Sequence, residues 1–409
     1  MSRWENKYVI GLTGNIAVGK SVVRQMLQHL GAYTIDADGL SHQAMMPGAP
    51  AYKPVLDMFG RFLLDEEGRI NRARLGSIVF TMPDALNVLE TIVHPVVTQA
   101  VNALVARSKQ QVIVIEAIKL LETDLAGMVD AIWVVDASPE SQLKRLVEKR
   151  KMTEDEARKR IYAQRPQSDK RARASVIIMN DGNVEETWKQ VQVAWNDIRR
   201  KIGEAPTQLH MKPTPQAQPS SLPPIPRQPP GTGQLNANRS LVDPKTEIIV
   251  RRGMPGNAET IASFISLVTG KQVARMDIML AFGQKSYHLA YGKHEQVIAV
   301  LGWTVENLIT RVDELYVAPD VPYNEIIHGL ISAIEDASRE LQSEVSFVVL
   351  PNSTSPDIFQ AFVKSGYQLL KLNEVKFPAW REAAHEMISE NNVQAFMKQL
   401  RADRVMKPI

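Results

Sequence analysis

The segment Gly14–Ser21 constrains the fold of this chain more than any other, because it has the pattern Gly-x-x-x-x-Gly-Lys-Ser. The apolar run Tyr8–Leu12 before it is predicted to be a buried strand, and Ser21–Leu30 after it carries apolar residues at helical spacing. A strand that passes through such a loop into a helix is the setting in which this motif binds phosphate. We therefore expect a nucleotide-binding α/β unit in the first part of the chain.

Each fixed residue of this loop has a chemical reason. Gly14 and Gly19 allow backbone angles that are closed to other residues, so successive N–H groups can converge on phosphate oxygens. The helix that begins there adds the positive end of its dipole. Lys20 supplies a positive charge for the β- and γ-phosphates of ATP, and the Ser21 hydroxyl is a candidate Mg²⁺ ligand. The predicted nucleotide-binding residues are Gly14, Asn15, Ile16, Ala17, Val18, Gly19, Lys20, Ser21 and Val22.

The alternation of strands and helices continues to about Ile202. The runs Val112–Ile115 and Ile132–Val135 are continuously apolar, as strands buried in a parallel sheet are. Between the strands, segments such as Pro139–Arg150 carry apolar residues at helical spacing. This order predicts an α/β fold in which helices flank a parallel sheet.

The composition changes sharply near Glu204, and this change divides the chain. Prolines recur from Pro206 to Pro230 among polar residues. Because proline lacks a backbone donor and the segment has no apolar face, we predict an extended linker at 204–245. A polyproline ligand for a partner domain is the alternative. The predicted domains are then residues 1–203 and 246–409, and the order of elements in the second is that of an α+β fold.

Bulk composition limits the classes of partner. The 409 residues are enough for two domains, each with its own core. Lysine and arginine (48) nearly balance aspartate and glutamate (45), which gives no general reason to expect nucleic acid or a membrane as partner. The sequence has no cysteine, so thiolate nucleophiles and disulfides are excluded. We expect a cytoplasmic protein, since no segment approaches the ~20 apolar residues that a membrane-spanning helix needs.

Two acidic residues point from nucleotide binding to phosphoryl transfer. Asp36 and Asp38 end a short predicted strand downstream of the first helix, and strand ends line the ligand crevice of a parallel sheet. Alternation along the strand would place both on the same side, near the phosphate loop. A carboxylate there can orient and deprotonate an accepting hydroxyl, as a small-molecule kinase requires. A surface turn is the alternative for such a pair.

Other classes of nucleotide-binding protein fit less well. A GTPase should carry an Asn-Lys-x-Asp motif, and the sequence has none. A motor ATPase should carry adjacent acids after an apolar strand, whereas Val112–Ile115 is followed by the single acid Glu116. A nucleoside or nucleotide kinase remains an alternative, as does a nucleotide-sensing module without enzymatic activity.

Several short motifs resemble the dephospho-CoA kinase family in order and spacing over residues 8–200. They are Gly11–Gly14 with the loop through Ser21, Ile35–Asp38, Pro47–Pro50, His94-Pro95, Val134–Asp136 and Asn180–Gly182. The resemblance implies ATP-dependent phosphorylation of the ribose 3′-hydroxyl of dephospho-CoA, the last step of coenzyme A synthesis, with Mg²⁺ as cofactor. It implies that Asp38 is the general base, with Asp36 beside it as a supporting acid. It also implies that His94 lies at the substrate pocket, with a surface histidine as the alternative, and that Asn180 lies beside the adenine.

The segment Lys144–Arg173 is dense in lysine and arginine. By itself it would be a solvated helical hairpin with charge pairs such as Glu154–Arg158. In P-loop kinases this position resembles the mobile lid, whose arginines close over the phosphates and exclude water. Arg145 and Arg150 are therefore the candidate catalytic arginines.

The sequence departs from the family pattern at a few positions. Asn15 and Ala17 stand where the family loop usually has glycines, and Lys119 stands where a proline is expected. We expect these changes to alter the shape of the loop and of the acceptor pocket rather than the class of reaction.

The second domain resembles the GNAT acyltransferase family in the order of its elements, from about Glu247 to Leu370. Asp313–Pro319 resembles the central strand of that family, and Phe362–Tyr367 resembles its late helix and turn. Where the family has a glycine-containing pyrophosphate loop, this chain has Asp320 and Glu325, which would repel a pyrophosphate.

We therefore predict a degenerate GNAT-like domain that serves structure, regulation or self-association. An active N-acyltransferase is the alternative, and Glu314 and Tyr316 would then be its candidate acid and base residues.

Overall fold

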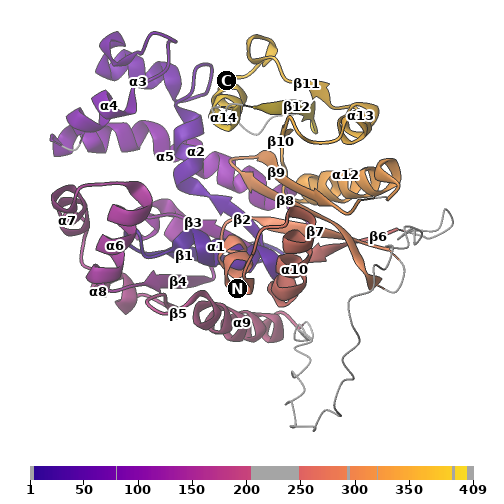
Figure 1. The fold of residues 1–409 in the computed structure, drawn as a ribbon. Helices are drawn as coiled ribbons and strands as arrows, with labels where there is room; N and C mark the ends of the chain where they lie inside the picture. The colour runs from indigo at the N-terminus through magenta and orange to yellow at the C-terminus, as the bar shows by residue number, and fades with distance from the viewer. Residues whose placement is uncertain are drawn as a thin grey trace, which may run out of the picture.

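The computed structural model describes residues 4–79, 81–203, 248–292, 295–319, 321–388 and 392–402, which form two domains that lie side by side (Figure 1). We call the described residues up to 203 the first domain and those from 248 onwards the second domain. The proline-rich linker predicted at 204–245 lies outside the described residues.

The first domain is built on a parallel sheet. Within the described residues its strands are β1 (Tyr8–Thr13), β2 (Tyr33–Asp36), β3 (Val112–Glu116), β4 (Ala131–Asp136) and β5 (Val176–Met179). They lie in the order β2-β3-β1-β4-β5, and all neighbours are parallel, which confirms the predicted α/β sheet. Their carboxyl ends therefore meet at one edge, where Leu12 and Asp36 both pair with Glu116.

Helices cover both faces of this sheet. Their bounds are α1 (Lys20–His29), α2 (Ala37–Ala44), α3 (Tyr52–Phe59), α4 (Arg72–Val79), α5 (Pro83–Arg107), α6 (Pro139–Arg150), α7 (Glu154–Tyr162), α8 (Gln167–Ala172) and α9 (Val184–Lys201). Helix α5 packs into the core that contains Ile35 and Ile113, whereas α1 and α9 pack into the core that contains Leu12 and Trp133. Helices α6, α7 and α8 form the helical lid predicted from the basic segment (Figure 1).

Helix α5 corrects one expectation from the sequence. It contains an 18-residue window of mean hydropathy 1.3, so by length and composition it could cross a membrane, and the expectation that no segment would reach this threshold is wrong. Its buried residues, among them Val93, Val97 and Val101, pack into the core of the first domain. The apolar composition of α5 therefore matches its place in that core, where it contacts α2 and α4.

The second domain is built on a mixed sheet. Within the described residues its strands are β6 (Ile249–Gly253), β7 (Ser286–Tyr291), β8 (Val297–Glu306), β9 (Ile309–Val317), β10 (Val345–Pro351), β11 (Gln368–Leu369) and β12 (Val393–Gln399). The order is β11-β12-β10-β9-β8-β7-β6, in which β9 and β10 are parallel and the other neighbours antiparallel.

The helices of the second domain include two that the sequence patterns did not predict. Their bounds are α10 (Ala258–Thr269), α11 (Arg275–Ala281), α12 (Tyr323–Glu340), α13 (Pro356–Lys364) and α14 (Pro378–Ile388). The predicted α+β class is confirmed, but α11, α14 and the strands β11 and β12 lie where no element was predicted.

Helix α1 is enclosed on both sides. Its apolar side packs on the sheet, as predicted for an amphipathic helix. Its polar side should then face water, but there the side chains are also buried: Arg24, Gln25, Gln28 and His29. Gln25 and His29 are covered by the second domain, which Figure 1 shows directly beside α1, whereas Arg24 pairs with Glu116 of the first domain.

Specific hydrogen bonds connect this buried polar side to the second domain. The Gln25 amide donates to the Ser286 hydroxyl at 3.1 Å. The His29 ring nitrogen Nε2 lies 2.9 Å from the carbonyl oxygen of Phe282, and the two rings meet edge to face. Burial, together with the charge of Arg252, lowers the pKa of His29 to about 3, so the imidazole is neutral in the interface. The helix that follows the phosphate loop is therefore part of the contact between the two domains.

The turn between β8 and β9 extends into the first domain. Asn307 and Leu308 form this turn with φ angles of +51° and +64°. Asparagine tolerates this left-handed conformation, but for leucine it costs on the order of 1–3 kcal/mol. The Leu308 side chain is buried in the first domain's core together with Leu40 and Leu104, and such burial contributes about 2 kcal/mol. Burial across the domain boundary therefore offsets the strain of the turn.

Candidate functional site

The side chains of Arg145 and Asn180 hold the phosphate loop in place by hydrogen bonds to its backbone carbonyl groups. The Arg145 guanidinium donates to the carbonyl oxygens of Ala17 and Val18, at 3.0 and 3.1 Å, and to the carbonyl oxygen of Asn180. The Asn180 amide donates to the carbonyl oxygen of Val18 at 2.8 Å. A Cβ atom at Gly19, whose φ is +97°, would lie 2.1 Å from the Asn180 amide nitrogen. Glycine is therefore required at this position by both its conformation and its packing.

The opposite side of the loop faces the lid. The backbone N–H of Asn15 donates to the Gln167 side chain at 3.0 Å, and that of Ile16 donates to the Gln164 side chain at 2.7 Å. These side-chain oxygens occupy N–H groups of the kind that bind phosphate oxygens. Ala17, which replaces a family glycine, adopts a left-handed φ of +59° as a glycine would. At this residue the backbone therefore adopts the conformation open to glycine, and the expected change in loop shape is not seen there.

Lys20 is buried at the start of α1, with 8% of its surface exposed, and its ammonium group donates to the carbonyl oxygen of Asn15 at 3.1 Å. Burial lowers the pKa of Lys20, while the nearby carboxylates of Glu116 and Asp38 oppose this effect. A cation is thus held at the centre of a group of acids.

The two predicted aspartates lie at this site, but not by the predicted strand alternation. Strand β2 ends at Asp36, whose carboxylate caps α2 by accepting the N–H of Gly39 at 2.9 Å. Asp38 lies in the first turn of α2 and accepts the N–H of Ile118 at 3.2 Å. The predicted geometry of two alternating strand residues is therefore wrong, because a helix begins between them.

Asp38 has an altered acidity. Its side chain is accessible from the space between the domains, yet protein surrounds it closely enough that loss of hydration raises its pKa. The neighbouring carboxylate of Asp36 raises it further, to about 6, against the opposing effects of the Ile118 N–H and of Lys20. At neutral pH most of the Asp38 carboxylate is ionised, and its pKa suits a general base.

Glu116 is a site residue that the sequence reasoning set aside. It is buried at the carboxyl end of β3, 2.6 Å from the guanidinium of Arg24, and it accepts a hydrogen bond from the hydroxyl of Ser21 at 3.4 Å. A single acid after a fully apolar strand was the available signal, but it was judged only against the pattern of motor ATPases. Ser21, Glu116 and the two aspartates offer oxygen atoms, the type of ligand that Mg²⁺ prefers, but among the described residues no three acidic or histidine side chains are grouped so that they could hold a metal ion by themselves.

Two cavities open from the site, and both have walls from both domains. The first, of about 630 Å³, lies over the phosphate loop and is lined by Lys20, Arg150 and Asn180, with Gln284 and Glu306 from the second domain. This volume is in the range of small-molecule binding sites.

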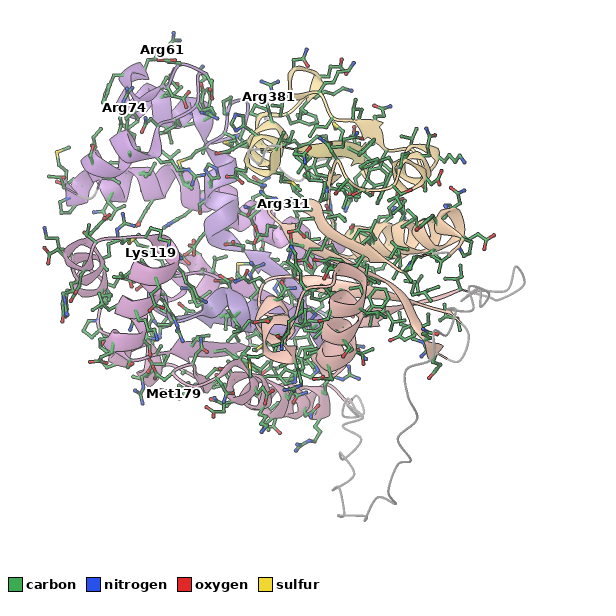
Figure 2. All side chains as sticks on the ribbon, in the orientation of Figure 1. Arg61, Arg74, Lys119, Met179, Arg311 and Arg381 are labelled. Atoms are coloured by element: carbon green, nitrogen blue, oxygen red, sulfur yellow. The ribbon has the colours of Figure 1, made fainter. Side chains whose placement is uncertain are left out.

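The second cavity, of about 420 Å³, extends from Asp38 and is lined also by Arg72, with Glu306 and Arg311 from the second domain. Arg311 is labelled in Figure 2, where it lies at the boundary between the two domains. Glu306 lines both cavities, so the two meet near the turn of the β8–β9 hairpin.

The remaining predicted residues are distributed unevenly. Arg145 and Arg150 both line the cavity over the phosphate loop. His94 lies half-buried on α5 and is not among the residues that line these two cavities, so its place in the substrate pocket stays a prediction. Lys119, which replaces a family proline and is labelled in Figure 2, pairs with Glu90 of α5.

The first domain is similar in sequence to known proteins. The family model of dephospho-CoA kinase matches residues 8–186. The dephospho-CoA kinase of Carboxydothermus hydrogenoformans is 41% identical over 201 residues, which are 47% of this chain and 98% of that protein. The dephospho-CoA kinase of Geobacter metallireducens is 43% identical over 192 residues, 46% of this chain and 96% of that protein.

Solved structures resemble the two parts of the chain separately. The protein TT1252 from Thermus thermophilus is 27% identical, with a TM-score of 0.43, and matches 47% of this chain and 98% of its own. An acetyltransferase structure from Salmonella typhimurium, with its cofactor acetyl-CoA, is 10% identical, with a TM-score of 0.30, and matches 40% of this chain and 99% of its own.

Proposed function

The chain belongs to the dephospho-CoA kinase family through residues 8–186, and from this premise we propose which of its own residues carry out the reaction. The first domain is a dephospho-CoA kinase. We assign the role of general base to Asp38, because this carboxylate lines the second cavity, interacts electrostatically with Lys20 and has a raised pKa. This placement is the observation that carries the proposal.

In the proposed reaction Asp38 accepts the proton of the ribose 3′-hydroxyl of dephospho-CoA. The hydroxyl oxygen then bonds to the γ-phosphorus of ATP as the bond to the leaving ADP breaks. Lys20 neutralises charge on the phosphates, and the loop N–H groups hold the phosphates in line. When bound near Ser21 and Glu116, Mg²⁺ would supply further charge neutralisation.

The assay that tests this function compares acceptors. With ATP and Mg²⁺, the full chain should turn over dephospho-CoA and show little turnover with nucleosides or nucleoside monophosphates. Phosphorylation of a nucleoside in preference to dephospho-CoA would favour the alternative small-molecule kinase. The family is one of soluble metabolic enzymes, and we expect cell fractionation to find this chain in the cytoplasm.

Of the two lid arginines, Arg150 is the one we propose to act on the phosphates. Arg145 already holds the phosphate loop through its hydrogen bonds, whereas Arg150 forms none of the hydrogen bonds or ion pairs found among the described residues and acts electrostatically on Lys20. Arg150→Ala should therefore lower kcat by about 10²- to 10³-fold with a small change in KM for ATP. Arg145→Ala should mainly raise KM for ATP, because it loosens the loop and Asn180.

Steady-state kinetics with ATP as the varied substrate measures this difference. Arg160→Ala is the matched control, since Arg160 is an exposed lid arginine paired with Glu156. The opposite pattern, with kcat dependent on Arg145 and KM on Arg150, would contradict the assignment.

The raised pKa of Asp38 predicts a pH dependence. A general base must be ionised, so kcat/KM for dephospho-CoA should fall as pH drops below about 6, where Asp38 becomes protonated in the free enzyme. Asp36→Asn removes a charge that raises this pKa, and asparagine still caps α2. The inflection of the pH profile should therefore move to lower pH in the variant. It should stay above the ordinary pKa of an aspartate, because burial still raises the pKa of Asp38. The difference between the two profiles isolates Asp38, because ATP titrates equally in both, and an unchanged or higher inflection would contradict its role.

For the second domain we propose a role other than acyl transfer. Glu314, the candidate acid of an acyltransferase, accepts a hydrogen bond from the Lys285 ammonium at 2.9 Å, and Lys285 also pairs with Asp313. This pairing holds β9 to the start of β7 and engages the carboxylate that proton transfer would need. Asp320, one of the acids that argued against pyrophosphate binding, lies outside the described residues.

Calorimetric titration of the full chain with acetyl-CoA tests this role. It should be done in saturating dephospho-CoA, which fills the acceptor site of the kinase. We expect no saturable binding in the micromolar range, and such binding would support the alternative of an active acyltransferase.

A further inference from the structure

The turn of the β8–β9 hairpin, residues Glu306–Leu308 of the second domain, lies against the kinase site. We call these residues the hairpin tip. Glu306 lines both cavities, and Leu308 is buried in the first domain's core. Asn307 contacts α2, since its carbonyl oxygen accepts a hydrogen bond from the side chain of Gln43. The hairpin tip is thus anchored in the first domain at more than one point.

The hairpin tip approaches helix α2 closely where Asn307 lies against Gly39. A Cβ atom at position 39 would lie 1.9 Å from the side-chain oxygen of Asn307. That oxygen is buried and has no hydrogen-bond partner within the described part of the chain, so its position follows from packing against α2. Gly39 has an ordinary helical conformation, so the obstacle to a side chain here is not the backbone but mainly Asn307, with the Asp36 side chain 3.2 Å away as a weaker one.

The contacted turn is the one that carries Asp38. Gly39 follows Asp38 directly, and its N–H is bonded to the capping carboxylate of Asp36. Helix α2 has eight residues, a length at which a helix has little stability of its own in water. Its first turn therefore depends on surrounding contacts, and the hairpin tip supplies two of them: Asn307 lies against Gly39, and Leu308 is buried in the same core cluster as Leu40.

We propose that the hairpin tip holds the first turn of α2 in the position from which Asp38 reaches the acceptor hydroxyl, so that the second domain is a positioning element of the kinase. The inference rests on the proposed role of Asp38 as general base. Asn307 and Leu308 are positioning residues, since they act through α2 and not on the substrate. A displacement of about 1 Å at a reacting group can cost about 10²-fold in rate, so a modest shift of α2 has a measurable effect.

A double-mutant cycle between Gly39 and Asn307 tests the proposal. Gly39→Ala should lower kcat by about 10²-fold, because the new methyl group meets Asn307, although alanine is otherwise favoured over glycine in a helix. Asn307→Gly keeps the left-handed turn and removes the side chain, and it should lower kcat about fivefold to tenfold with KM for ATP unchanged. The double variant should recover most of the loss seen with Gly39→Ala, because the clash is gone.

Asn392→Gly is the matched control. Asn392 also adopts a left-handed φ, of +79°, in the second domain, and it lines neither cavity, so this change should leave kinase activity as in the wild type. Thermal unfolding of all variants separates loss of positioning from loss of fold. If Gly39→Ala does not fold, Asn307→Gly and the double variant still decide the question through kcat.

Three outcomes can be told apart. Recovery of kcat in the double variant supports the positioning role. Independent losses in the cycle, or wild-type kcat in both single variants, would overturn it while leaving the kinase assignment in place. A wild-type chain that does not phosphorylate dephospho-CoA would instead overturn the proposed function itself.

Discussion

Asp38→Asn is expected to lower kcat for dephospho-CoA phosphorylation by about 10²- to 10⁴-fold, the range in which general bases contribute. Asparagine keeps the size of the side chain and an oxygen that can accept the Ile118 N–H, but it cannot take a proton from the acceptor hydroxyl. KM for ATP should change little, because Asp38 lines the second cavity, where we propose that the acceptor binds, and not the cavity over the phosphate loop.

The same variant should unfold at a higher temperature at neutral pH. The folded-state pKa of Asp38, about 6, lies above its ordinary value of 3.8, so folding disfavours the ionised carboxylate. That cost is absent below pH 3.8, grows as pH rises towards 6 and is complete above it, and a neutral amide avoids it. A variant that is less active and more stable is therefore expected. Asp36→Asn is the control, and if it loses as much activity as Asp38→Asn, the base has been wrongly assigned.

Lys20→Ala is the second change from which we expect a large loss, of about 10²- to 10³-fold in kcat/KM for ATP. The ammonium group is buried beside three carboxylates, those of Asp36, Asp38 and Glu116. Without it, these acids lose a cation that compensates them, and phosphate oxygens would meet net negative charge.

A second effect distinguishes loss of charge from loss of structure. Lys20 opposes the rise in the pKa of Asp38, so Lys20→Ala should move the acidic inflection of the pH profile to higher pH. Lys189→Ala, at an exposed position on α9, should change neither quantity. A Lys20→Ala enzyme with wild-type kcat/KM for ATP would exclude the proposed nucleotide site.

Local patterns were sufficient to predict the first sheet. Tyr8–Leu12 and Ile132–Val135 are continuously apolar because they are buried on both faces, and they became β1 and β4 within a residue or two. The loop at Gly14–Ser21 was predictable because its function fixes its residues. In each case the physical cause lies within a few positions of the residues that reveal it.

Contacts between distant segments were not predictable in this way. Gln25, Gln28 and His29 lie on the polar side of a helix, and such residues usually face water, so their burial against the second domain had no local signal. Glu116 could be assigned to the site only when the pairing of β3 with β1 and β2 was known. The turn residue Leu308 likewise gave no sign that it fills space in another domain.

The polar side of α1 also bears on how such a chain could arise. The relatives described above align with the first domain over nearly their full length, and the aligned segments cover only 46–47% of this chain. A surface of arginine, glutamine and histidine can remain in water without promoting aggregation. Such a helix face is compatible both with exposure to water and with the cover of a second domain. The second domain, in turn, contributes the apolar side chain of Leu308 to the contact between the domains. Protein engineers could use the same helix face to graft other modules.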